Sequence, residues 1–182
     1  LTLKFLIMKT QFFKTSLIML GLVFGLMTTS CSDDDGDSGA NTAAAGTVKA
    51  NVDGYNFESQ AMTSSASVVD QGGSTTMLIT ATDLQGRNIT LQIIGYNGEG
   101  SYDVGGSNSI FVNATWVEVD INNPTNSDTY ISPYDGDAVR GFVDVDSDSG
   151  NNIQGTFEFT AADNMGGSAV VNVTNGSFNL DY

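Results

Sequence analysis

The sequence predicts an all-β fold, an antiparallel β-sandwich of about 8–10 strands, on three observations. Apolar and polar residues alternate with a period of two in many short segments, as in half-buried strands. Turn residues recur about every 8 to 12 positions, and the chain has 21 glycines but only 2 prolines. No amphipathic helix of useful length follows residue 31. A closed or partly open antiparallel β-barrel is the alternative, because both folds show the same alternation.

Residues 1–30 are predicted to be a lipoprotein signal peptide. Three lysines precede the apolar run LIMLGLVFGLM at 17–27, and the small polar residues TTS follow it. A membrane-spanning helix needs about 20 apolar residues, so this run fits the core of a signal peptide better. Both Leu1 and Met8 are compatible with the start of such a segment.

The only cysteine of the chain, Cys31, follows this segment directly. Residues 8–37 resemble the N-terminus of bacterial lipoproteins, although Thr28 stands where the usual lipobox has leucine. The resemblance implies cleavage before Cys31 and attachment of a diacylglyceryl group to its thiol, which with a further acyl chain gives a stable membrane anchor. A secreted protein with a free thiol is the alternative.

Residues 31–45 are predicted to be an acidic, disordered tether, because SDDDGDSG at 32–39 has no apolar periodicity. Aspartates after the lipidated cysteine also resemble the export signal of surface-exposed lipoproteins of the Bacteroidota type. That resemblance implies the outer membrane, lipid-anchored and exposed at the cell surface. A solvated spacer that faces the periplasm is the alternative.

Residues 46–182 are predicted to be a single β domain that begins with two hairpins. In the first, a turn at Asp53-Gly54 joins the strand at 47–52 to a return strand at 55–57. In the second, the turn at 84–86 joins two strongly alternating strands. The residues expected to face the core are Val48, Ala50, Val52, Met77, Ile79, Ala81, Ile89, Leu91 and Ile93.

Four further strand segments are expected, at 109–121, 138–145, 155–161 and 169–182, the last interrupted at Asn175-Gly176. Their expected core residues are Val117, Val119, Ile121, Val139, Val143, Val145, Phe157, Phe159, Ala161, Val171, Val173, Phe178, Leu180 and Tyr182. The motifs GSYDVGG at 100–106, GTFEFTA at 155–161 and TNGSF at 174–178 are similar to those of small uncharacterised lipoprotein domains of the same bacterial group. The similarity implies a fold and a location but no activity.

The charge of the chain limits its partners. The formal net charge is −15, and from residue 31 onward three basic residues stand against 21 acidic ones. Such a field repels nucleic acid and anionic lipid headgroups, so we expect neither as a ligand. The absence of histidine from the sequence excludes Cys/His zinc sites and Ser-His-Asp catalysis. No cofactor is expected.

Two acidic segments are candidate metal sites. Asp144, Asp146 and Asp148 resemble the start of a calcium loop, but Ser149 and Gly155 stand where an EF-hand has glycine and a bidentate glutamate. A polar turn is therefore favoured here, and likewise at 134–137.

Two other sets of side chains, the glutamates and the aromatic residues, are candidates for acting on or binding glycans. A pair among the glutamates would suit a carboxylate-based glycosidase, and aromatic rings would suit stacking on sugars. Ordinary solvated strand positions and core or turn packing are favoured for these residues, which are Glu58, Glu99, Glu118, Glu158, Trp116, Tyr96, Tyr102, Tyr130 and Tyr134.

These observations predict a membrane-anchored, non-enzymatic surface lipoprotein whose β domain is a binding module of unknown ligand, with a glycan or an envelope protein as the candidate partners. A carboxylate-based glycan hydrolase, an accessory glycan-binding protein and a purely structural envelope lipoprotein are the alternatives. The sequence assigns no catalytic, metal or cofactor-binding residue.

Overall fold

The computed structural model describes residues 42–106 and 111–182, and its architecture is all-β. The helical elements in this part of the chain are two single turns of 3-10 helix, η2 (Ala61–Thr63) and η3 (Pro124–Asn126). Eleven strands account for most of the rest. They are β1 (Thr47–Val52), β2 (Tyr55–Glu58), β3 (Ser64–Gln71), β4 (Ser74–Thr82), β5 (Asn88–Ile94), β6 (Gly100–Val104), β7 (Phe111–Glu118), β8 (Asp128–Ser132), β9 (Gly141–Asp148), β10 (Asn152–Asp163) and β11 (Val170–Asp181).

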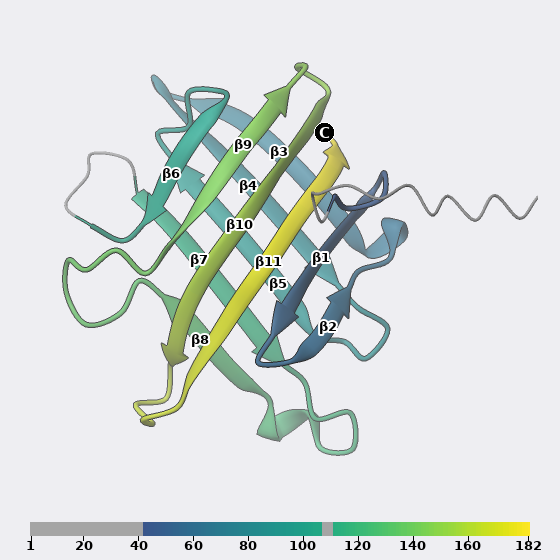
Figure 1. Cartoon of the computed structure of the whole chain (residues 1–182), viewed down its shortest axis with the longest axis vertical. Helices are drawn as coiled ribbons and strands as arrows, with labels where there is room; N and C mark the ends of the chain where they lie inside the picture. The colour runs from purple at the N-terminus through teal and green to yellow at the C-terminus, as the bar shows by residue number, and fades with distance from the viewer. Residues whose placement is uncertain (1–41, 107–110) are drawn as a thin grey trace, which may run out of the picture. The chain divides into compact units, whose positions relative to one another are not determined.

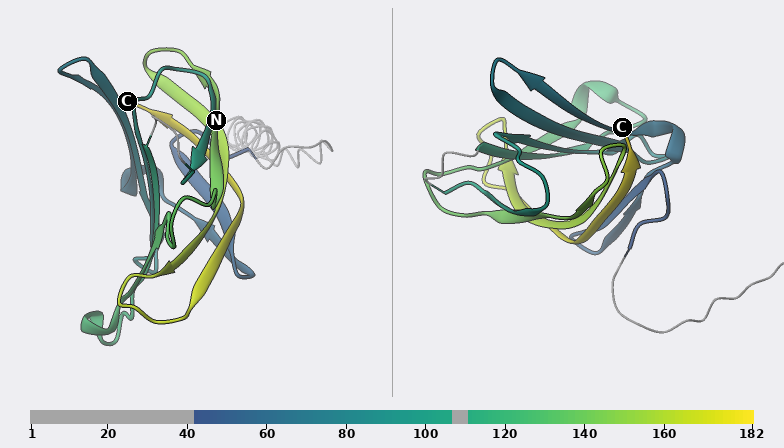
Figure 2. Two further views of the ribbon diagram at one scale, coloured as in Figure 1. Left: turned by 90° about the vertical axis from the view of Figure 1, so that its left-hand side faces the viewer. Right: turned by 90° about the horizontal axis from the view of Figure 1, so that it is seen from above.

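All strand pairs are antiparallel, in the order β2-β1-β11-β10-β8-β7-β5-β4-β3, and β9 pairs with both β10 and β6 (Figure 1). The long strand β10 has two neighbours on one side. It pairs with β9 from Ile153 to Phe159 and with β8 at Ala162 and Asp163. The sheet therefore curls at β10 into two facing layers, one with β3, β4, β5 and β7 and the other with β1, β9, β10 and β11 (Figure 2). This arrangement fits a β-sandwich or a partly open barrel.

Large side chains fill the space between the two layers. The rings of Phe57 and Trp116 meet edge to face at 5.7 Å, and those of Phe157 and Phe178 lie 6.4 Å apart. Backbone approaches this aromatic cluster closely, since a Cβ added at Gly176 would lie 2.6 Å from the ring of Phe157. The described residues belong to one compact unit that contains this core, so the unit has the features of a domain that folds on its own.

The two predicted hairpins are confirmed. Asp53 and Gly54 both have positive φ, as a two-residue hairpin turn requires. The predicted inward faces of these strands are also buried, because apolar residues occupy one phase of the alternation and mainly polar residues occupy the other. The confirmed buried residues are Val48, Ala50, Val52, Met77, Ile79, Ala81, Ile89, Leu91 and Ile93, and Phe57 is buried with them.

The predicted inward face of the 109–121 segment is wrong. Val117 is half-buried because it lies in the outward phase of β7, and Val119 (half-buried) and Ile121 (70% exposed) lie beyond the end of the strand at Glu118. This segment carries apolar residues in both phases of the alternation. Pairing with β5 sets the phase, and the residues that face the core are Val112, Ala114 and Trp116.

Two predicted strand boundaries also need correction. Val139 was expected in the core, but it precedes β9 and is 55% exposed. β11 does not break at Asn175-Gly176. It continues through a β-bulge, where Asn175 has a φ of 52° and the register with β10 shifts. No helix in the described ranges 42–106 and 111–182 is long and apolar enough to cross a membrane.

Candidate functional site

The predicted anchor lies outside the described residues: Cys31 and the segments 1–30 and 31–41 are not described. The last residues of the predicted tether are described. Ala43 is buried, and the Gly46 N–H donates to the carbonyl of Asn179 at 2.7 Å. Packing of the β domain therefore begins a few residues before Gly46.

Asp144, Asp146 and Asp148 all lie in β9, where a bulge separates their side chains. The register with β10 shifts between Gln154 and Gly155, so that Asp148 lies opposite Ile153 on the inward face. Asp144 lies opposite Thr156 on the outer face. Among the described residues, no group of three or more Asp, Glu, His or Cys side chains is arranged to hold a metal ion.

Asp148 instead belongs to a group that we call the tyrosine clasp, formed by Tyr96, Asp148 and Tyr182. Both tyrosine hydroxyls donate to the Asp148 carboxylate at 2.6 Å. The hydrogen bonds from Tyr182 and Tyr96 lower the pKa of Asp148. Burial, and then the hydrogen bond to Asp148, raises the pKa of Tyr96. The clasp joins the β5–β6 connection, the β9–β10 hairpin and the end of β11.

A second group surrounds the buried carboxylate of Asp83, and we call it the arginine cluster: Tyr55, Asp83, Arg87 and Glu118. The Tyr55 hydroxyl and the Arg87 backbone N–H donate to Asp83, each at 2.9 Å. The Arg87 guanidinium stacks on Tyr55 at 3.9 Å and lies 3.6 Å from Glu118. Burial, followed by the hydrogen bond to Asp83, raises the pKa of Tyr55.

The four glutamates are dispersed over the domain. Glu118 belongs to the arginine cluster, and Glu99 accepts the backbone N–H of Asp148 at 3.2 Å. Glu158 accepts the backbone N–H of Asn175, and Glu58 lines a pocket described below.

The aromatic residues considered for sugar stacking pack mainly within the domain. Trp116, Tyr96 and Tyr102 are buried. Tyr130 is half-buried against the core, and Arg140 stacks on Tyr134 at 4.1 Å. Tyr102 lies in β6 and Tyr130 in β8, so the packing in turns that was favoured for the tyrosines is wrong for these two. Core packing, the favoured interpretation, is confirmed for Trp116.

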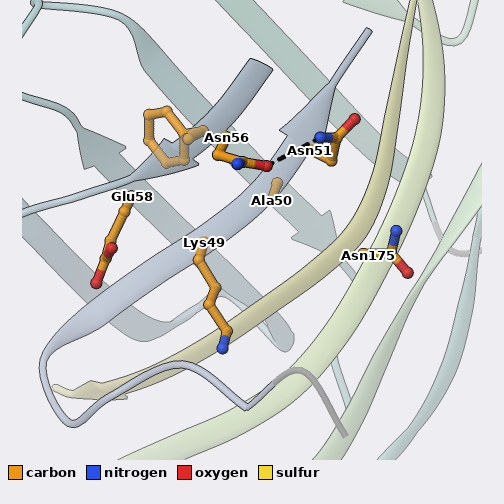
Figure 3. A pocket seen from close by; sticks show the side chains of 7 residues that line it. Lys49, Ala50, Asn51, Asn56, Glu58 and Asn175 are labelled. Atoms are coloured by element: carbon orange, nitrogen blue, oxygen red, sulfur yellow. Dashed lines mark hydrogen bonds between the residues drawn. The ribbon is translucent and has the colours of Figure 1, made fainter. Parts of the chain in front are cut away.

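The clearest hollow is a pocket of 310 Å³ on the outer face of β1, β2 and β11 (Figure 3). We call it the amide pocket, because three asparagines line it. Its outward side chains alternate along β1 and β2 with the buried residues, so the strands that form the core also shape this pocket. The lining residues are Lys49, Ala50, Asn51, Asn56, Phe57, Glu58 and Asn175.

The amide pocket offers both hydrogen-bond donors and acceptors. Asn51 is fixed, since it accepts from the Gly54 N–H at 2.9 Å and donates to Asn56 at 3.1 Å. Lys49 and Glu58 lie directly opposite each other on β1 and β2. Within the described part of the chain, neither side chain has an ion pair or hydrogen bond. Both charges are therefore available to a ligand.

A second hollow of 180 Å³ lies beside the amide pocket over β9, β10 and β11. Arg140, Phe142 and Glu158 line it. The Asn175 N–H of the amide pocket donates to Glu158 at 3.2 Å, so the walls of the two hollows are connected. Asn175 occupies this place because the β11 bulge gives it a positive φ.

The amide pocket was not predicted from the sequence, although one signal indicates part of it. A two-residue turn at Asp53-Gly54 fixes the register of the first hairpin and places Lys49 opposite Glu58 and Asn51 opposite Asn56. Asn175 could not be added, because its position depends on the pairing of β1 with β11.

A family model matches residues 44–180, and its description is a domain of unknown function, DUF6252. The chain belongs to the DUF6252 family. The match covers the strands of the β domain almost completely, which agrees with the expected membership of an uncharacterised family. Among curated proteins and among solved structures, no match was found for this DUF6252 chain.

Proposed function

We propose that this DUF6252 protein is a lipid-anchored lipoprotein of the Bacteroidota type, whose β domain is a non-enzymatic binding module at the cell surface. The signal-like segment, the single Cys31 and the aspartates after it support the anchor and the location. Acylation at Cys31 gives the membrane attachment, and the acidic segment holds the domain away from the bilayer.

The amide pocket is the observation that carries the binding role. It combines unpaired charges of both signs, at Lys49 and Glu58, with the amide of Asn175. Polar ligands such as sugars or peptide segments both donate and accept hydrogen bonds, so they match this set of groups. The ligand we propose is a glycan or a segment of an envelope protein.

The anchor is tested in cells with an alkyne-tagged fatty acid. We expect the tag on the wild-type protein and its loss in Cys31→Ala, with the wild type in the membrane fraction. Protease added to intact cells is expected to cut the predicted tether at 31–45 and release the domain. Protection from protease until the outer membrane is broken would place the domain in the periplasm.

Binding is tested with a fragment of residues 40–182 on a glycan array and in pull-downs from envelope extracts, with and without calcium. Lys49→Gln and Glu58→Gln are expected to reduce the retained signal at least about tenfold, since each removes a charged hydrogen-bonding group. Asp137→Asn is the control, because Asp137 is exposed and outside the pocket. Equal binding by all variants would contradict the role of the amide pocket.

A further inference from the structure

Within the described residues β3 ends the strand order and is hydrogen-bonded to β4 alone, so its other edge has no hydrogen-bonded strand, although part of β11 packs near β3. The other ends of the sheet are shorter: β2 has 4 residues and β6 has 5, whereas β3 has 8. Natural edge strands are commonly protected by lysine, proline or bulges. β3 has none of these features, because its sequence is SSASVVDQ and its register with β4 is continuous.

The turn between β3 and β4 defines which backbone groups point outward. Gly72 and Gly73 have φ values of 64° and 90°, so they form a two-residue turn closed by the hydrogen-bonded pair Gln71 and Ser74. The Thr75 carbonyl points the other way and accepts two N–H groups near the end of β5. In an antiparallel pair the hydrogen-bonding groups of successive residues point alternately toward and away from the partner strand. The N–H and C=O groups of Ala66, Val68 and Asp70 therefore point away from β4.

These three residues present a row of backbone donors and acceptors at the open edge. Within residues 42–106 and 111–182, their N–H and C=O groups have no hydrogen-bond partner. We propose that a second copy of this chain binds here, with the two β3 strands antiparallel and centred on Val68. In this register Ala66 of each copy lies opposite Asp70 of the other, and every outward group of the row is paired.

Charge does not oppose this pairing at the contact. Asp70 is the only charged residue of β3, and it lies opposite an alanine of the second copy. The two Asp70 residues are offset by four positions, or about 14 Å at the usual rise per residue. This exceeds the screening length of about 8 Å at physiological salt. The remaining opposition is the net negative charge of each domain, which salt screens.

Self-pairing also accounts for two exposed apolar side chains on the outer face. Val69 is 43% exposed, and Leu78, which lies beside Ser67, is 37% exposed. In the proposed register Ser67 faces Val69 of the second copy. Since serine is small, Leu78 of one copy and Val69 of the other come together over it. The pair thereby removes apolar surface from water on both sides of the two-fold axis.

Cysteine cross-linking tests the register, because the only native cysteine is Cys31 and the fragment 40–182 lacks it. Facing residues at a non-hydrogen-bonded position have Cα atoms about 4.5 Å apart, within disulfide range. Ser67→Cys mixed with Val69→Cys should give a disulfide-linked dimer under mild oxidation. Ser65→Cys mixed with Val69→Cys is the matched control and should not, because those residues are diagonal, about 7–8 Å apart.

Sedimentation of the unmodified fragment provides an independent measurement. A concentration-dependent dimer is expected, with a dissociation constant several-fold lower in 500 mM than in 20 mM NaCl, because salt screens the repulsion of two acidic domains. A fragment that stays monomeric at 1 mM in both salts would overturn the proposal. Equal cross-linking in the control mixture would overturn it as well.

Discussion

The tyrosine clasp and the arginine cluster lie at opposite ends of β5, and each holds an aspartate carboxylate in place with a different set of side chains. Each holds an aspartate that accepts from tyrosine, Asp148 in the clasp and Asp83 in the cluster. The cluster adds a cation, Arg87, and through it an ion pair with Glu118. The Asp148 carboxylate of the clasp accepts from two tyrosine hydroxyls and from the Gly150 backbone N–H at 3.0 Å, all of which are neutral donors. Stability at the two ends should therefore respond differently to pH, to salt and to loss of the carboxylate.

The largest effect is expected from Asp83→Ala. The side chain accepts the backbone N–H groups of Gln85 and Arg87 and the hydroxyl of Tyr55, each at 2.9 Å. Its removal leaves the two backbone N–H groups without this acceptor, while the Tyr55 hydroxyl keeps its hydrogen bond to Gln85 at 3.1 Å. The loss of this buried acceptor should lower the free energy of unfolding by about 3 kcal/mol. Urea denaturation measures this change. Asp137→Asn serves as control and should stay within about 0.5 kcal/mol, while a loss below about 1 kcal/mol in D83A would contradict the assignment.

A smaller effect, and a change of pH dependence, is expected from Asp148→Asn. The pKa of Asp148 is lowered by its tyrosine donors, so the folded state keeps the carboxylate charged where the unfolded chain already takes up a proton. Its stabilisation is present above the unfolded pKa of about 4 and is lost as pH falls through the lower folded pKa. The melting temperature of D148N should therefore fall less steeply than that of the wild type between pH 5 and pH 2 (approximately).

Parallel melting curves of wild type and D148N would contradict this account. At pH 7 the variant should be less stable by about 1–2 kcal/mol, since a charged acceptor is replaced by a neutral one. Tyr182→Phe is the matched comparison, because it removes one donor and keeps the carboxylate.

The smallest effect is expected from Glu118→Gln in the arginine cluster. The Arg87–Glu118 pair is at 3.6 Å and Glu118 is 47% exposed, so the pair should contribute about 0.5 kcal/mol or less. The difference between wild type and E118Q should vanish in 1 M NaCl (approximately), where charges are screened over about 3 Å. A difference that persists there would mean that Glu118 acts through packing instead.

Sequence patterns predicted the strands with one apolar phase and failed where two phases compete. Val48, Ala50 and Val52 alternate with polar residues, so only one face can be buried. In β7 both phases are apolar, and pairing with β5 buries the phase in which Trp116 contacts Phe57, nearly 60 positions earlier in the chain. No local pattern contains that information.

Bulges were the second source of difference between expectation and structure. The extra residue in β9 turns Asp148 inward toward Tyr96 and Tyr182, whereas strict alternation would keep it with Asp144. Such a slip is set by pairing with β10. The candidate site was partly predictable for the same reason: hairpin register relates Lys49 to Glu58, but Asn175 enters only through the long-range pairing of β1 and β11.

The position of β11 between β1 and β10 has a consequence for the order of folding. Thr47, at the start of the first strand, pairs with Asn179, near the end of the last. During synthesis the N-terminal strands leave the ribosome first. Until β11 has been made, β1 and β2 can form only an isolated hairpin, whose stability in water is marginal. Loop closure over this distance makes assembly slow. Ribosome-bound chains lacking β11 should consequently stay sensitive to protease, and resistance should appear abruptly once that strand is free.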